Sequence, residues 1–101
     1  EDSTTLPHIL GPNANINKAF ITQGCDVDGA ITNSVLFTSA KVATGAKVID
    51  SVLMPGAVVE EGAVVQRSLV ADGIRIGKGA VVGDPDSEHI ELVAKRVKGA
   101  E

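Results

Sequence analysis

The sequence predicts an all-β fold, a single-stranded parallel β-helix in which three short strands make each coil. Three observations predict it: a period of 17 residues, a recurring pair of a small residue and a large aliphatic residue two positions apart, and glycines at a constant phase of the repeat. A fixed period of this length is typical of solenoids, in which each repeat stacks on the next.

Each coil contains three triplets of the form small-x-aliphatic, with Ile74 in place of the small residue in one of them. Residues two apart on a strand point to the same face, so both members of the pair are expected to face the interior. The recurring triplets are Ser34-Val35-Leu36, Ser51-Val52-Leu53 and Ser68-Leu69-Val70; Ala40-Lys41-Val42, Ala57-Val58-Val59 and Ile74-Arg75-Ile76; and Ala46-Lys47-Val48, Ala63-Val64-Val65 and Ala80-Val81-Val82. Each strand then pairs in parallel with the strands of adjacent coils.

The aliphatic positions step by six, six and five residues, as in Leu36, Val42, Val48 and Leu53, which describes a hexapeptide repeat with one residue removed per coil. Parallel crossovers are normally right-handed, but hexapeptide solenoids are a left-handed exception, and a left-handed β-helix is expected here. Glycine tolerates the positive φ of a sharp corner, and Gly45 and Pro55-Gly56 mark two different corners.

The repeat divides the chain into three parts. Residues 1–7 are polar and are interpreted as a linker, residues 8–83 as the β-helix of about four coils with a frayed start, and residues 84–101 as a loop and C-terminal cap. The step from Val27 to Ile31 is two residues short, so one coil is irregular. In the last part, Ser87 could cap a helix, whereas Ile90 and Leu92 suit a strand; a capping strand is preferred.

Composition excludes several classes of function. The formal charge is -4 without a basic stripe, which argues against a nucleic-acid or anionic-membrane surface. The sequence has one cysteine, no long apolar run and no cleavable signal, so a cytoplasmic location is expected. The first residue is Glu1 rather than Met, which suggests a piece of a longer protein.

The outward positions of one wall are aliphatic in every coil: Val35, Val52 and Leu69. Phe37 and Met54 lie at the next corner and could extend this strip or fold back over the coil edge. A contiguous apolar strip predicts an interface with another domain or subunit, although valine is also simply common on strands.

The sequence lacks the residue patterns that the catalytic members of hexapeptide-repeat families need. Acyltransferases need a catalytic His and zinc-dependent carbonic anhydrases need three His ligands, but this chain has only His8 and His89, both in the flanks. Cys25 falls in the inward small-residue column and is expected to be buried and inert. Lys41 and Arg75 lie in one outward column, two coils and about 10 Å apart, and an anion such as a phosphate ester could bridge them. We therefore predict no catalytic, cofactor or metal site.

One succession of motifs is more specific than the repeat: Gln23-Gly24-Cys25, Gly29, Asn33-Ser34-Val35-Leu36-Phe37 and Asp50-Ser51-Val52-Leu53-Met54-Pro55-Gly56. It resembles the C-terminal domain of bacterial glucose-1-phosphate adenylyltransferase, over residues from about Leu6 to Gly83. The resemblance implies an enzyme that makes ADP-glucose and pyrophosphate from ATP and glucose 1-phosphate in glycogen synthesis. It also implies that ATP and Mg are bound only by a separate N-terminal nucleotidyltransferase domain, from which residues 1–7 would be the linker.

The resemblance further implies that this domain packs against its own catalytic domain, assembles a homo- or heterotetramer and takes part in allosteric control by anionic effectors. Whether the subunit is of the catalytic or the regulatory type stays open, although Met54-Pro55-Gly56 leans toward the catalytic type. Two alternatives also remain: an independent hexapeptide-repeat acyltransferase, and the β-helix of another sugar-nucleotide pyrophosphorylase.

Overall fold

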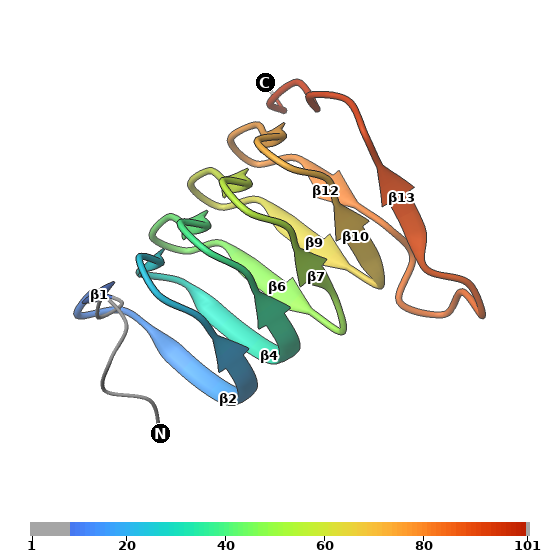
Figure 1. Cartoon of the computed structure of the whole chain (residues 1–101). Coiled ribbons are helices and arrows are strands. Elements are labelled where there is room, and N and C mark those ends of the chain that lie inside the picture. Colours follow the sequence, from blue (N-terminus) through green and yellow to red (C-terminus); the bar gives the residue numbers. More distant parts are fainter. Residues whose placement is uncertain (1–8, 101) are drawn as a thin grey trace.

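The computed structural model describes residues 9–100, and within them it contains strands and no helix. The strands are β1 (Ile9–Leu10), β2 (Asn15–Ile21), β3 (Asp26–Val27), β4 (Ala30–Leu36), β5 (Lys41–Val42), β6 (Lys47–Ile49), β7 (Val52–Leu53), β8 (Val58–Val59), β9 (Val64–Gln66), β10 (Ser68–Val70), β11 (Arg75–Ile76), β12 (Val81–Val82) and β13 (Glu91–Val93). They stack as the coils of a parallel β-helix (Figure 1), which confirms the predicted fold class.

The coil has three walls, which we name A, B and C. Wall A is the sheet β1-β3-β5-β8-β11. Wall B holds the first halves of β2 and β4 with β6, β9 and β12, and wall C holds their second halves with β7, β10 and β13. Because β2 and β4 continue around the corner between walls B and C, these two walls form one sheet, and the strand pairs are parallel throughout the described residues.

The inward columns form the core, as predicted. Val27, Ile31 and Leu36, one from each wall of the second coil, are fully buried, and the equivalent residues of the next two coils are equally inaccessible. Burying each such side chain stabilises the fold by roughly 1.5–3 kcal/mol relative to exposure. The first coil is less well covered, since Leu10 is 48% exposed, in keeping with a frayed start.

A ladder of buried serines lines the start of wall C. The backbone N–H of Ser51 donates to Ser34 Oγ at 3.0 Å, and that of Ser68 donates to Ser51 Oγ at 3.0 Å. Each hydroxyl in turn donates to a carbonyl two residues earlier in its own coil. Serine therefore occupies this inward column because the turn from wall B to wall C leaves an N–H that needs a side-chain acceptor.

The three corners differ in their chemistry. Gly45 and Gly56 adopt a positive φ at two of them, as the sequence predicted. The corner between walls B and C instead places non-glycine residues in the left-handed region, with φ between 46° and 57°. These residues are Lys18, Asn33, Asp50 and Arg67. Glycine is not needed there, because the serine ladder stabilises the turn and Asn33 and Asp50 are residue types that tolerate this conformation.

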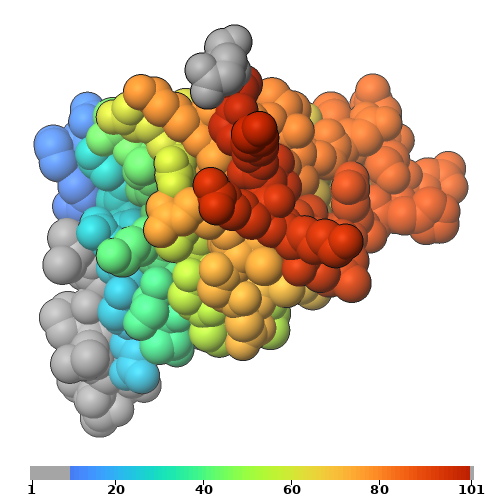
Figure 2. Space-filling view, turned by 90° about the horizontal axis from the view of Figure 1, so that it is seen from above, coloured from blue at the N-terminus to red at the C-terminus, as the bar shows by residue number. Residues whose placement is uncertain are grey.

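The C-terminal part of the chain contains a strand, β13, as expected for a capping strand. β13 pairs with β10 in wall C, so the residues after Gly83 return as a strand and not as a helix. The segment between β12 and β13 projects from the body (right in Figure 2), and Val97 then forms a bridge with Ile76 above wall A. In the described part of the chain, no helix has the length and hydropathy needed to span a bilayer.

Candidate functional site

The predicted interface residues lie in register on the outside of wall C. Val35 pairs with Val52, and Val52 pairs with Leu69, so their side chains stack one above another from coil to coil. The structure extends this column at both ends, since Phe20 pairs with Val35 and Leu92 pairs with Leu69. We call these five residues the apolar ladder.

The two end residues of the apolar ladder are its most exposed members. Phe20 is 64% exposed and Leu92 is 66% exposed, whereas the three central residues are partly covered by their neighbours. At strand spacing, five rungs extend over about 19 Å. An exposed aliphatic and aromatic strip of this length is characteristic of an interaction surface.

Sequence reasoning missed both ends of the ladder, for different reasons. Phe20 follows Ala19 and precedes Ile21, which is the small-x-aliphatic pattern of the repeat, so its outward position could have been deduced from the frame. The outward position of Leu92 could not be deduced in this way, because the repeat is broken after Gly83. Only the pairing of β13 with β10 places Leu92 in the column.

Phe37 and Met54 occupy the corner that follows wall C. The backbone N–H of Phe37 donates to the carbonyl of Leu53, and that of Met54 donates to the carbonyl of Val70, so the two residues take equivalent places in successive coils. Phe37 is 37% exposed and Met54 is partly buried. Both remain at the surface, at the corner that follows the ladder.

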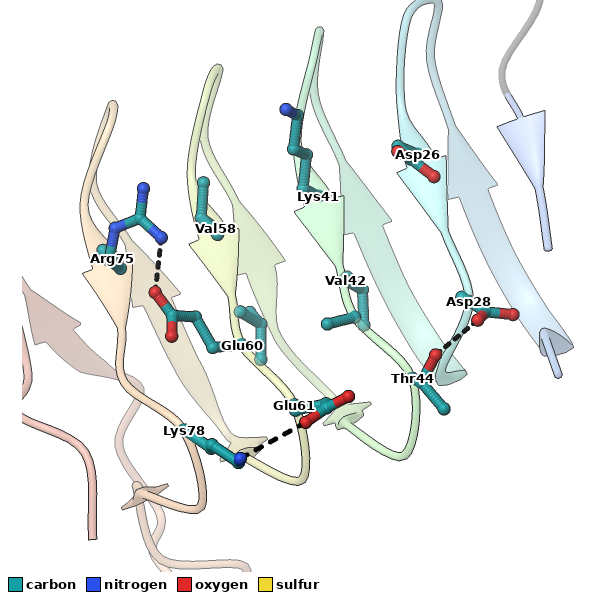
Figure 3. Close-up of a pocket in the computed structure, with 12 residues that line it drawn as sticks. Asp26, Asp28, Lys41, Val42, Thr44, Val58, Glu60, Glu61, Arg75 and Lys78 are labelled. Atoms are coloured by element: carbon teal, nitrogen blue, oxygen red, sulfur yellow. Dashed lines mark hydrogen bonds and ion pairs between the residues drawn. The ribbon is translucent and has the colours of Figure 1, made fainter.

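Wall A carries an open groove of about 540 Å³ with a mixed lining of charged and aliphatic residues (Figure 3). Arg75 forms an ion pair with Glu60, and Lys78 Nζ lies 3.5 Å from Glu61 Oε1. Lys41 and Arg75 do share a column, as predicted, with Val58 between them. Because Arg75 is already paired, the groove does not present the two cations jointly to an anion.

The irregular coil places a carboxylate at the corner between walls A and B. Asp28 Oδ1 accepts a hydrogen bond from the backbone N–H of Asn13 at 2.8 Å, and Oδ2 accepts one from the Thr44 hydroxyl. Asn13 belongs to the coil before and Thr44 to the coil after, so Asp28 connects three coils. The hydroxyl of Thr44 and then the amide of Asn13 lower the pKa of Asp28 below its ordinary value of 3.8.

Two glycines make room for this arrangement. A Cβ on Gly11 would lie 2.3 Å from Asp28 Oδ1, and a Cβ on Gly29 would lie 2.5 Å from the carbonyl oxygen of Ala46. Gly29 is therefore restricted to glycine by the approach of backbone atoms, whereas a Cβ at position 11 would force the Asp28 side chain to rotate away from Asn13 and Thr44.

Cys25 is buried in the inward column, as predicted. Its Sγ lies 3.2 Å from the carbonyl oxygen of Phe37, to which the thiol donates. Burial raises the pKa of the Cys25 thiol, more than its nearby hydrogen-bond donors lower it. A thiol in this state is a poor nucleophile.

The histidines do not form a site in the described residues. His89 lies on the projecting segment before β13, and His8 lies outside residues 9–100. Within that range, no three His, Cys, Asp or Glu side chains are grouped so that they could hold a metal ion.

Comparison with known proteins matches this architecture to a family. A family model described as GlmU-like, C-terminal hexapeptide, matches residues 7–97, which is nearly the whole chain. The chain is also similar to a protein named glucose-1-phosphate adenylyltransferase from Acetivibrio thermocellus, with 36% identity over 42 residues, 42% of this chain and 10% of that protein. A protein of the same name from Clostridioides difficile is 42% identical over 43 residues, 43% of this chain and 11% of that protein. The chain thus spans about a tenth of the length of these relatives.

Proposed function

The chain belongs to the GlmU-like C-terminal hexapeptide family, and on this premise we propose that it is the C-terminal β-helix domain of a glucose-1-phosphate adenylyltransferase. In this proposal the complete enzyme converts ATP and glucose 1-phosphate to ADP-glucose and pyrophosphate for glycogen synthesis. A separate N-terminal domain binds ATP and Mg, and the β-helix serves assembly and regulation in the cytoplasm. The sequence identity to two proteins of that name, over about 42 residues, supports the choice of enzyme.

The apolar ladder is the observation that carries the assembly role. Its five side chains stand in register on wall C and leave Phe20 and Leu92 largely exposed. Transfer of such a strip from water into a protein interface contributes roughly 25 cal/mol for each Å² of apolar surface that is covered. The proposed occupant is the protein's own catalytic domain or another subunit of a homo- or heterotetramer.

The regulatory role would require a site for an anionic effector. In the described residues, Lys41 projects from wall A without an ion pair, whereas Arg75 and Lys78 are paired with Glu60 and Glu61. Cations without a partner are the more suitable ligands for a phosphate group, because they need not first break an existing ion pair.

The assembly role is tested by Val52→Asp in the full-length enzyme. Val52 points outward, so the charge should be tolerated by the fold but should disrupt any interface on wall C. Val64→Asp is the matched control, since Val64 is an outward and partly buried valine on wall B. We expect light scattering to give a smaller particle for Val52→Asp and an unchanged particle for Val64→Asp.

Three results would count against the proposed function. An unchanged mass for the Val52→Asp enzyme would refute the interface on wall C. Turnover of an acyl-CoA substrate by the 101-residue chain itself would instead identify an acyltransferase, and a reading frame without an upstream nucleotidyltransferase domain would refute the assignment of the enzyme.

A further inference from the structure

The irregular coil leaves a notch in the corner between walls A and B. In the coils before and after it, three residues separate the inward aliphatic residue from the next inward small residue, as Ala43, Thr44 and Gly45 do after Val42. In the irregular coil only Asp28 does so. The register confirms the shortening, because Val27 pairs with Val42 at a separation of 15 residues while Leu10 pairs with Val27 at 17.

The recessed corner is a concave site of about 340 Å³. Gly29 and Ala30 form its floor, Asn13 and Asn15 come from the first coil, and Thr44 and Lys47 come from the third. This volume is at the lower end of the range for small-molecule sites and is sufficient for one or two sugar rings.

The outer rim of the notch is polar, and its side chains Asn15 and Lys47 have donors and acceptors that are not used within the described residues. Asn15 and Lys47 are in register with Ala30, one on either side, so their side chains flank its methyl group. Within residues 9–100 neither side chain has a hydrogen bond or an ion pair. Asn15 supplies both donors and an acceptor, and Lys47 supplies donors.

A fixed negative charge stands beside the notch, because Asp28 lines the adjoining groove on wall A while its hydrogen-bond partners Asn13 and Thr44 line the notch. Asp28 is held by Asn13 and Thr44, and each carboxylate oxygen accepts one hydrogen bond and keeps capacity for another. This charge disfavours an anionic ligand, and a single carboxylate is too few ligands for a divalent metal ion. Among the described residues no metal-binding group of three is present.

We propose that this notch binds a neutral polyhydroxylated ligand, a pyranose unit of a carbohydrate. Each sugar hydroxyl both donates and accepts hydrogen bonds, which matches acceptors on Asn15 and the Thr44 hydroxyl oxygen together with donors on Asn15 and Lys47. The floor of Gly29 and Ala30 is apolar and shallow, and suits the C–H face of a sugar ring. Phe20 belongs to wall C and Phe37 to the corner after it, so no aromatic ring stacks on the ligand and millimolar affinity is expected.

The test is an NMR titration of the ¹⁵N-labelled chain with maltose, with inorganic phosphate as a separate anionic probe. Maltose should produce saturable shifts of the Gly29, Ala30 and Gly45 amides, and phosphate should not. Asn15→Ala and Lys47→Ala should each weaken maltose binding about three- to tenfold, the usual effect of losing one hydrogen bond. Asn17→Ala is the matched control, because Asn17 is exposed on the same strand outside the notch.

Three outcomes would overturn the inference: no saturable shift up to about 100 mM maltose, where a millimolar site is filled; shifts of the notch amides with phosphate instead of maltose; or equal weakening by Asn17→Ala. The titration requires neither nucleotide chemistry nor assembly. Its failure would therefore leave the proposed function untouched, and failure of the proposed function would leave the sugar site standing.

Discussion

The backbone N–H of Ser51 donates a hydrogen bond to the hydroxyl oxygen of Ser34 across 17 residues of sequence, at 3.0 Å and out of contact with water. In the same way, the backbone N–H of Ser68 donates to the hydroxyl oxygen of Ser51. The hydroxyls thus supply acceptors for amide groups at a point where the corner interrupts the ladder of backbone hydrogen bonds between coils. An N–H left without an acceptor in this position would cost the full penalty of its desolvation.

Ser51→Ala is expected to lower the free energy of unfolding by about 1–3 kcal/mol, because it leaves the buried N–H of Ser68 without an acceptor. Ser68→Ala is the matched control: it removes a buried hydroxyl from the same column, but within the described residues no N–H donates to Ser68 Oγ. Urea denaturation of both variants measures the difference. Equal losses of stability for the two variants would mean that the volume of the hydroxyl, and not its role as an amide acceptor, accounts for the recurrence of serine in this column.

Asp28 makes the stability of the irregular coil depend on pH. Because the hydrogen bonds from Thr44 and Asn13 lower the pKa of Asp28 in the folded state, ionised Asp28 stabilises the fold at pH values above its ordinary pKa of 3.8. This contribution is lost as the pH falls through the lowered folded-state pKa. At neutral pH, wild type should therefore be more stable than Asp28→Asn, and the difference should shrink below pH 3.8.

The measurement is the urea midpoint of wild type and Asp28→Asn over a series of pH values. Asp26→Asn is the control, since Asp26 is an exposed carboxylate on the neighbouring strand for which no hydrogen bond to the corner is present. A stability difference between wild type and Asp28→Asn that stays constant at acid pH would show that the Asp28 charge plays no part in holding the corner.

Ser39 provides a test of backbone strain. It adopts a φ of 62° at a corner where Gly24, Gly56 and Gly73 adopt φ values of 75°, 75° and 68°. The left-handed conformation is unfavourable for residues with a Cβ, so Ser39→Gly should raise the free energy of unfolding by about 0.5–1 kcal/mol after the greater flexibility of glycine in the unfolded chain is counted.

Asn33→Gly is the matched comparison for Ser39→Gly. Asn33 has a φ of 48°, but its side-chain amide donates to Asp50 Oδ1 at 2.8 Å, and glycine would lose that bond. Asn33→Gly should therefore gain less stability or lose some. The thermal midpoints of the two variants measure this difference. A larger rise in the midpoint for Asn33→Gly than for Ser39→Gly would show that the Asn33–Asp50 hydrogen bond does not stabilise the corner.

The periodic part of this protein can be predicted from its sequence. A repeat of small and aliphatic residues specifies which side chains face inward, because one-residue slips in a strand would turn Val27, Leu36 and their equivalents to solvent. The same periodicity places Val35, Val52 and Leu69 in one outward column, and the structure has them in register. The shortened step between Val27 and Ile31 was also visible as a break in the period.

The arrangement of residues where the period fails is seen only in the folded chain. Leu92 joins the apolar ladder only because β13 pairs with β10 after a projecting segment. Asp28 meets Asn13 and Thr44 only because removing two residues draws one corner inward between its neighbours. Periodic positions follow from a local rule repeated along the chain, whereas a contact across an interrupted repeat depends on how far the backbone is displaced in three dimensions, and no spacing in the sequence records that displacement.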